Sequence, residues 1–370
     1  MTTASAVRHS NARDCLLVLR DAGQALTVAE LASATGLSRP TVDAVLQDLG
    51  AVGAAVPAPV ATSGAAGRPA RRFSFEPAVS SIAALDIGAR TVRCLVTDAA
   101  GELLAQAVIP LSSADPLETL EGAIRETGHA PSALGIAAPG ILGPDGRITQ
   151  SLATPGLVGL DLAGELTRRL GCPVAVENDI KLAAFAEHHR DAEADSMLFV
   201  QLGNRISVAA ILEGRILQGA HRLAGELGSQ RGMRWTANSE RGRLRWSTGD
   251  EAKPLLDRAA RGDAAAQREI EEFCIQIAPR LATVLLTLDP ARVVIGGGLS
   301  RAGDTLLDPL RRALDELLVT GQPPELVAAR LTTDGALVGA LGLAFTHGST
   351  QVFGIPEVPA PWSRLLDARA

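Results

Sequence analysis

The chain has 370 residues, of which 46% are hydrophobic and 21% are charged, so it can bury sizeable cores in two or three domains. Its net charge of −6 excludes a globally basic nucleic-acid-binding protein, so any contact with DNA must come from a local patch. The four cysteines are scattered without CxxC or Cys/His spacing, which excludes a disulfide framework and a zinc knuckle. No stretch approaches the ~18 apolar residues of a membrane helix, and the N-terminal segment MTTASAVRHSNARD lacks the apolar core of a signal peptide, so we expect a cytoplasmic protein.

Residues 10–50 carry apolar side chains at helical spacing, which predicts three short helices. Gly23 and Gly36 are expected to end the first and second helices, because glycine adopts the left-handed backbone of a helix end without cost. Thr27 and Ser38 are expected to cap the second and third helices at their N-termini. This arrangement is typical of a helix-turn-helix.

Residues 51–77 show short apolar alternation at both ends and a Gly/Ala/Ser/Pro-rich middle. Such a pattern predicts a β-hairpin with a loose tip, that is, a wing. Pro77 then marks the end of a first domain, which we place at residues 1–78.

If the first domain reads DNA, its third helix must place its N-terminal half in a major groove about 12 Å wide. The outward residues of that half should then be short, polar or basic. Arg39 is the expected base or phosphate reader, and Arg68 is expected to enter the narrow minor groove. The predicted DNA-binding residues are Ser38, Arg39, Thr41, Asp43, Arg68, Arg71 and Arg72. Residues 1–75 carry seven arginines and five acids (7 − 5 = +2), which favours DNA modestly; ordinary helical packing is the alternative.

From Ser80 onward, strands and helices alternate as strand–strand–strand–helix–strand–helix, twice over. This predicts an open α/β domain of two lobes with a cleft between them. Long helices are expected over 264–288 and 304–318. Residues 350–370 are expected to form a tail packed loosely on the surface.

The segment ASATGLSRPTVDAVLQDL, followed by GRPA, resembles the winged head of repressors of the ROK family (repressors, open reading frames and sugar kinases). From Ile82 to Phe345 the chain resembles the actin-like ATPase fold of ROK sugar kinases. The resemblance implies a fold of class α/β: an N-terminal winged helix-turn-helix followed by a two-lobed actin-like ATPase (sugar-kinase-like) domain. We expect that domain over 79–349, with a tail over 350–370.

The two glycine turns that cradle ATP phosphates in ROK kinases are altered here. The first, DIGGTK in relatives, keeps Asp86 but places Ala89 and Arg90 where a close-approach Gly and a Thr stand. The second, LGTGIGGGI in relatives, reads LGNRISVA over 202–209 and keeps one glycine. A side chain tends to obstruct phosphate where the main chain must approach it closely. The alternative for the first turn is that the Arg90 side chain itself contacts phosphate. The later segment VVIGGGLS, 293–300, matches the turn that lies on the adenosine side of the nucleotide in relatives. The alternative is that its glycines are needed only because a strand-to-helix turn packs small residues.

The sugar side of the resemblance is better preserved. VENDIKLAAFAE resembles the family's VENDANAAALGE, which implies that Asn178 and Asp179 hold sugar hydroxyls and that Asp179 stands where the catalytic base sits. An Asn-Asp pair after a strand can equally be a helix cap. Glu226 matches a sugar-contacting Glu, whereas the Asn of the family's PNLxGW loop is missing from 155–160.

The stretch AGELGSQRGMRWTANSERGRLRW resembles the zinc-bearing segment of the family, GExGH and then CxCGxxGCxE, with every metal ligand replaced. The ligand positions hold Ser229, Thr236, Asn238 and Arg243, and Arg245 replaces the following Glu. No metal and no cofactor is therefore expected. Without zinc, packing must hold this loop, and the candidates for that are Met233, Trp235 and Trp246.

The same loop is crowded with arginine, at positions 231, 234, 241, 243 and 245. A dense arginine cluster can bind an acidic or phosphorylated effector. The alternative is a solvated surface in a chain whose basic residues are almost all arginine.

Together these features predict a DNA-binding transcription regulator. The residues themselves do not show whether it represses or activates, and the resemblance to the family implies repression. Its kinase-like domain is expected to sense a small sugar-like effector through Asn178, Asp179 and Glu226 without phosphorylating it. A homodimer or tetramer would bind a pseudo-palindromic operator in double-stranded DNA. The alternatives are an active ROK sugar kinase, which the retained Asp179 and Asp86 favour, and a protein-interaction scaffold that senses no small molecule.

Overall fold

The computed structural model describes residues 3–59, 70–112, 114–190, 194–230, 232–239, 242–319 and 323–367. The chain forms two compact units. The first contains Met1–Ile136, Asp161–Val176 and Ala340–Ala368, and the second contains Ala137–Leu160, Glu177–Gly339 and Arg369–Ala370. None of the helices in the described residues is both long and apolar enough to cross a membrane.

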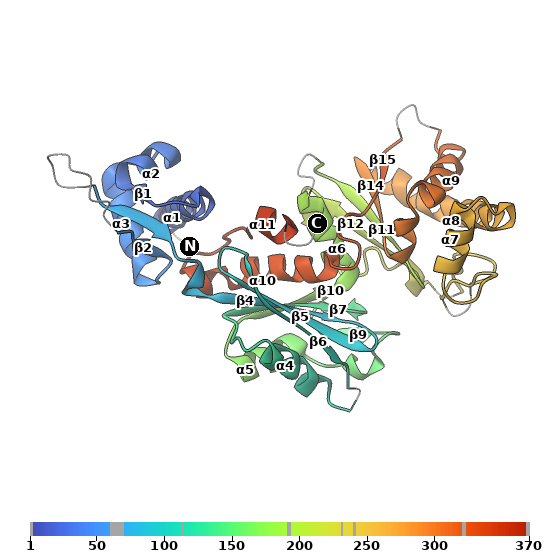
Figure 1. Ribbon diagram of the computed structural model, residues 1–370, viewed down its shortest axis with the longest axis horizontal. Coiled ribbons are helices and arrows are strands. Elements are labelled where there is room, and N and C mark those ends of the chain that lie inside the picture. The colour runs from blue at the N-terminus through green and yellow to red at the C-terminus, as the bar shows by residue number, and fades with distance from the viewer. Residues whose placement is uncertain are drawn as a thin grey trace. The chain divides into compact units, whose positions relative to one another are not determined.

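The first unit begins with a three-helix head and a small sheet, drawn in blue in Figure 1. Its helices are α1 (Thr3–Ala22), α2 (Val28–Thr35) and α3 (Arg39–Ala51), and its strands are β1 (Leu26–Thr27), β2 (Ala55–Pro57) and β3 (Arg72–Phe75). The strands form an antiparallel sheet of order β1-β3-β2. The three predicted helices and the wing hairpin are confirmed; β1, only two residues long, was too short to predict.

The predicted caps explain where α2 and α3 begin. The Thr27 hydroxyl accepts from the Glu30 main-chain N–H at 3.2 Å, and the Glu30 carboxylate accepts in return from the Thr27 N–H at 2.6 Å. Such a reciprocal capping box satisfies two main-chain donors that a helix start otherwise leaves unpaired. Gly36 ends α2 with a φ of 71°, in the left-handed region that favours glycine.

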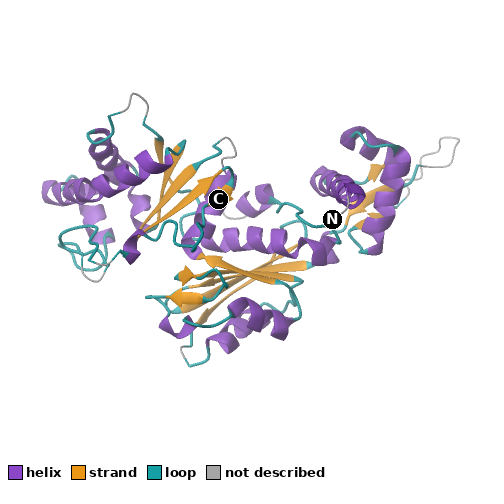
Figure 2. Ribbon diagram, turned by 180° about the vertical axis from the view of Figure 1, so that it is seen from behind, coloured by secondary structure: helices purple, strands orange, loops and turns teal. Residues whose placement is uncertain are grey.

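The rest of the first unit is built on a five-stranded sheet of order β10-β7-β4-β5-β6. The strands are β4 (Ser81–Ile87), β5 (Thr91–Asp98), β6 (Leu103–Pro110), β7 (Ala133–Ala138) and β10 (Val174–Asn178), preceded by the 3-10 turn η1 (Pro77–Val79). Helices α4 (Pro116–Glu126) and α5 (Leu162–Leu170) lie on one face, and α10 (Gly335–Phe353) lies on the other (Figures 1 and 2). A Cβ on Gly135 of β7 would lie 1.9 Å from the Ala340 carbonyl oxygen, so glycine is what lets this helix touch the sheet.

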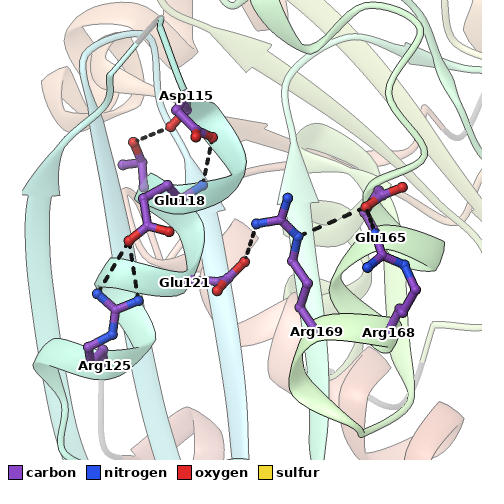
Figure 3. A network of polar contacts seen from close by, with 8 residues as sticks. Asp115, Glu118, Glu121, Arg125, Glu165, Arg168 and Arg169 are labelled. Atoms are coloured by element: carbon purple, nitrogen blue, oxygen red, sulfur yellow. Dashed lines mark hydrogen bonds and ion pairs between the residues drawn. The ribbon is translucent and has the colours of Figure 1, made fainter.

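Charged side chains join α4 to α5 on the surface of this unit (Figure 3). Arg169 of α5 lies 2.5 Å from the Glu121 carboxylate of α4, and Glu165 also contacts it, at 3.9 Å. Within α4, Arg125 pairs with Glu118 at 3.3 Å. Exposed pairs of this kind contribute about 0–1 kcal/mol each, so the network orients the helices more than it stabilises them.

The second unit contains a five-stranded sheet of order β13-β12-β11-β14-β15. Its elements, in chain order, are β8 (Ile141–Leu142), β9 (Ile148–Gln150), η2 (Pro155–Leu157), α6 (Asp179–Arg190), β11 (Met197–Leu202), β12 (Ile206–Leu212), β13 (Arg215–Ile216), η3 (Leu227–Ser229), α7 (Lys253–Ala260), α8 (Ala264–Leu288), β14 (Arg292–Gly296), η4 (Gly298–Ala302), α9 (Asp304–Asp315) and β15 (Glu325–Ala328). Helix α6 covers one face, and α7, α8 and α9 pack on the other through a large apolar core.

The two sheets have the same strand arrangement. Each places the first strand of its set in the centre, two antiparallel neighbours on one side, and the two later strands on the other. The repeated pattern read from the sequence is therefore confirmed, and with it the α/β fold class.

The segment after residue 350 is where the sequence-based expectation was wrong. Helix α10 continues to Phe353, and α11 (Trp362–Asp367) follows. Val358 is 0% exposed, and a Cβ on Gly342 would lie 2.0 Å from the Trp362 ring. Prolines pointed to a loose tail, but buried apolar side chains fix this segment instead.

Candidate DNA-binding and effector sites

The N-terminal half of α3 presents a polar surface. Ser38 caps the helix, since its hydroxyl accepts from the Thr41 N–H at 3.3 Å, and the two hydroxyl oxygens lie 2.8 Å apart. Arg39, the first residue of α3, and Asp43 are exposed. The opposite face is buried in the head through Val42, Val45, Leu46 and Leu49. Arg39 and Asp43, one helical turn apart, therefore share the exposed side of a firmly packed helix, with Ser38 at its N-terminus, whereas Thr41 is half-buried.

The wing residues divide into two groups. Arg72 Nη1 donates to the Ala25 carbonyl at 2.8 Å, and its guanidinium also faces the Glu30 carboxylate at 3.5 Å. The Arg71 guanidinium lies over the Phe73 ring, 5.0 Å from its centre. Arg72 therefore fastens the base of the wing to the head, which competes with a phosphate contact. Arg68, the predicted minor-groove residue, lies outside the described residues.

The first glycine turn, between β4 and β5, contains an ion pair. Asp86 and Arg93 are register partners across the two strands, and Arg93 Nε and Nη2 donate to Asp86 Oδ2 at 3.0 and 2.7 Å. Both side chains are largely buried, at 17% and 26% exposed. The Gly88 N–H donates to the Thr91 carbonyl at 2.9 Å. The Asp86 carboxylate is thus neutralised by Arg93 of the same protein, and the Gly88 N–H of the turn is paired with a carbonyl.

The second glycine turn, between β11 and β12, is also occupied by its own chain. The Gly203 N–H donates to the Arg205 carbonyl at 3.0 Å, and the Asn204 carbonyl accepts from the Leu244 N–H at 2.9 Å. Burial, and then the nearby Arg243, lower the pKa of Arg205. This turn is a closed hairpin tied to the arginine-rich loop rather than an open row of N–H groups.

Two of the three glycines that match the adenosine-side turn are required by packing, whereas a Cβ on Gly298 would meet nothing within 4 Å. Gly297 has a φ of 83°, and a Cβ there would lie 2.4 Å from the Leu202 carbonyl oxygen. A Cβ on Gly296 would lie 2.4 Å from the Phe199 ring. Packing alone therefore accounts for these two glycines, and they carry no separate evidence for nucleotide.

On the sugar side, Asn178 serves as a helix cap. Its Oδ1 accepts from the main-chain N–H groups of Ile180 and Lys181 at 2.9 and 3.0 Å, and its Nδ2 donates to the Gly140 carbonyl at 2.9 Å. It is 8% exposed. Asp179, the first residue of α6, is half-buried and also accepts from the Ile180 N–H, at 2.9 Å. Asn178 therefore caps α6, as the alternative to sugar binding predicted. Asp179 is the more exposed of the two side chains.

Glu226 lies at the start of η3, in a group of charged residues that the sequence had not indicated. Burial raises the pKa of Glu226, and Lys181 counteracts this by lowering it. Glu177, one residue before Asn178, is 4% exposed and forms an ion pair with Arg222 at 2.5 Å. One signal could have revealed this group: Lys181 is one of two lysines in an arginine-rich chain.

The ROK family model matches residues 82–231 and 229–347, and the IclR helix-turn-helix domain model matches residues 11–57. Together the two ROK matches span most of the chain. The chain belongs to the ROK family.

The ROK relatives include both kinases and a regulator. A glucokinase of Halalkalibacterium halodurans is 25% identical over 303 residues, covering 69% of this chain and 92% of the relative. The fold is similar to a ROK glucokinase from Streptomyces griseus in complex with glucose and AMPPNP (TM-score 0.60, 23% identity, 71% and 99% covered). It is also similar to a ROK family transcriptional regulator, a homologue of E. coli MLC protein (TM-score 0.73, 18% identity, 98% and 99% covered).

In this ROK chain the loop that resembles the family's zinc segment is held by packing. Trp235 and Leu244 are buried in the core of the second unit, with Met233 and Trp246 against it, and the Trp246 ring lies 4.9 Å from that of Phe273. This confirms the expectation that apolar side chains hold the loop.

At the former ligand positions, Thr236 bonds through its hydroxyl to that of Ser239 at 2.8 Å. Among the described residues, no three His, Cys, Asp or Glu side chains gather closely enough to hold a metal ion. The side chain of Ser229, together with Arg231 and Arg241, lies outside the described residues.

Proposed function

We propose that this ROK protein is a DNA-binding transcription regulator, acting mainly as a repressor. Its ROK domain senses a sugar-like effector without phosphorylating it. A homodimer or tetramer presents two winged heads to a pseudo-palindromic operator, because a two-fold protein matches a two-fold site. Effector binding shifts the population between DNA-competent and DNA-incompetent states.

The observation that carries this proposal is the outward face of α3. Arg39 and Asp43 are exposed beside the Ser38 cap, on a helix whose opposite face is fully buried. A helix built this way can enter a groove as a rigid unit, since its inner face is fixed by the head's own core. The match of residues 11–57 to a helix-turn-helix domain model supports the same assignment.

The ion pair between Asp86 and Arg93 supports sensing without catalysis. Phosphoryl transfer depends on Mg²⁺ and on oriented donors around the phosphates. A carboxylate already bonded to a guanidinium at 2.7 Å is a poor partner for Mg²⁺ or for water bound to it. The relatives that are glucokinases indicate a hexose or a derivative of one as the effector class.

The DNA part is tested by selecting a duplex from a random pool with the full-length chain and then measuring its affinity across a salt series. We expect log Kd to rise linearly with log salt concentration, because phosphate contacts release counterions. Arg39→Ala should weaken the selected duplex by about 1–3 kcal/mol and an unrelated duplex by less, if Arg39 reads bases. Arg13→Ala, in α1, is the matched control. A flat salt response, or equal losses on both duplexes, would contradict this role.

The second candidate function is an active sugar kinase, and Asp179 favours it. This carboxylate lies half-buried at the N-terminus of α6, in the position of the family's catalytic base. Hexose phosphorylation that disappears in Asp179→Asn would establish this function in place of pure sensing.

A further inference from the structure

The segment between β13 and η3 is fastened to α6 by four polar side chains, which we call the Glu177 clamp: Glu177, Lys181, Gln218 and Arg222. Glu177 Oε2 accepts from Arg222 Nη2 at 2.5 Å and from Gln218 Nε2 at 2.7 Å. Its other oxygen, Oε1, accepts from the Asn178 N–H at 2.8 Å. One buried carboxylate therefore binds two side chains of the segment and the main chain that begins α6.

Lys181 closes the clamp from the helix side. Its ammonium group donates to the Arg222 carbonyl at 3.2 Å, and only 3% of the residue is exposed. Arg222 is therefore held at both ends, by its guanidinium and by its carbonyl. Its φ of 59° lies in the left-handed region that costs a non-glycine residue energy. A residue kept in that conformation requires contacts that hold it there.

The clamp ends next to Glu226, four residues beyond Arg222 in the chain. Burial disfavours the charged form of that carboxyl, and the ammonium of Lys181 opposes the effect. An ionised carboxylate accepts hydrogen bonds only, so it suits the hydroxyl groups of a polyol. Keeping Glu226 charged is therefore a condition for its binding hydroxyl donors.

We propose that the Glu177 clamp fixes the segment between β13 and η3 and thereby positions Glu226 to accept hydrogen bonds from effector hydroxyls. Glu177, Lys181 and Arg222 act through Glu226 and are positioning residues. The identity of Glu226 as an effector contact depends on the proposed function, whereas the clamp itself does not.

Hydrogen exchange of the full chain, without DNA or sugar, tests the clamp. We expect the amides of residues 218–226 to exchange about tenfold faster in Glu177→Gln and in Arg222→Gly, while α8 keeps its protection. Glycine suits the left-handed φ, so Arg222→Gly removes the guanidinium without adding backbone strain. Glycine also frees the backbone, and Glu177→Gln, which leaves the main chain unchanged, controls for that effect. Arg222→Lys, which keeps the charge, should recover part of the protection. Arg292→Gln removes a different ion pair of the same unit, 2.7 Å long, and is the control.

Unchanged or slower exchange in Arg222→Gly would overturn the clamp, because backbone geometry alone would then hold the segment. If that variant fails to fold, Glu177→Gln decides in its place, since it keeps the side-chain shape. Neither readout involves DNA or effector, so failure of the clamp and failure of the proposed regulator function are distinguishable.

The role of Lys181 has its own readout, the titration of the Glu226 carboxyl followed by carbon-13 NMR and assigned with Glu226→Gln. Lys181→Met should raise the midpoint pH, and Lys181→Arg should return it toward the wild-type value. A purely structural lysine would leave the titration unchanged in every folded variant. That result would overturn the link between the clamp and Glu226.

Discussion

At the scale of single residues, the two turns that match the family's phosphate-binding turns make contacts within this chain. Arg93 forms an ion pair with Asp86, and the Gly88 N–H donates to the Thr91 carbonyl. In the second turn, the Gly203 N–H donates to the Arg205 carbonyl. A carboxylate can exchange partners and a turn can open, so neither contact alone excludes kinase activity. Together they occupy the carboxylate of the first turn and one main-chain donor of each turn, which supports the proposed sensing role.

His189 gives a residue-scale prediction about pH. Burial, and then the neighbouring His188, lower its pKa from 6.5 to about 4. The unfolded chain binds this proton below pH 6.5, whereas the folded chain resists it, so stability is full above pH 6.5 and falls toward pH 4. Chemical denaturation at pH 7 and pH 5 should show a smaller loss in His189→Gln than in the wild type.

The control for that experiment is His221→Gln, which replaces an exposed histidine and should keep the wild-type loss. His189 packs edge-on against Phe185 with ring centres 4.7 Å apart, so its variant is also expected to be somewhat less stable at pH 7. Equal pH dependence in all three proteins would contradict the lowered pKa of His189.

At the scale of elements, α6 organises the sugar side of the second unit. Its cap is Asn178, and the Glu177 clamp fastens its first turn to the segment that carries Glu226. Asn178→Ala should lower the free energy of unfolding by about 1–2 kcal/mol, because the Lys181 N–H loses its acceptor and the Ile180 N–H keeps only Asp179. Asn178→Asp keeps the capping oxygen but sets a second oxygen against the Gly140 carbonyl, so it should recover only part of the loss in the same denaturation measurement.

The comparison between these two variants separates cap from ligand contact. If Asn178→Ala were as stable as the wild type within about 0.3 kcal/mol, the cap would not be what Asn178 contributes. A loss of sugar binding in Asn178→Asp at unchanged stability would then identify the amide as an effector contact.

The elements themselves could be predicted from the sequence, because helix periodicity and caps are local. Thr27, Ser38 and Gly36 mark the ends of α2 and α3, where the structure has them. The contact between Glu177 and Arg222 joins residues 45 positions apart, and no local pattern indicates it. Long-range pairings depend on strand register and loop paths, which single-sequence periodicity does not encode.

Long-range contacts also explain why the partners of Arg72 in the wing and of the segment after residue 350 could not be predicted from the sequence. The basic residues of the wing suggested DNA contacts for Arg72, but its pairing with the Ala25 carbonyl depends on the two-residue strand β1. The prolines after residue 350 suggested a loose tail, but Trp362 fits against Gly342, a contact that requires the path of α10. In both segments the composition did not indicate the long-range contacts that fix the side chains.

At the scale of the whole molecule, a helix-turn-helix head precedes a duplicated α/β body of the ROK family. If the ROK domain binds its effector more tightly in one conformational state than in the other, the effector shifts the population toward that state. The size of the shift is set by the difference in binding free energy between the two states. An effector present at 100 times its Kd would stabilise the folded protein by about 2.7 kcal/mol, which a thermal shift against hexoses detects. A scaffold that senses no small molecule would show no such shift.

We expect the kinase-like body to bind its effector without transferring phosphate. The most direct measurement is the transfer of labelled γ-phosphate from ATP with Mg²⁺ to a panel of hexoses, comparing the wild-type chain with Asp179→Asn. We expect no labelled sugar above the level of the variant, because Asp86 is bonded to Arg93 and both glycine turns are closed. Robust transfer that depends on Asp179 would contradict it.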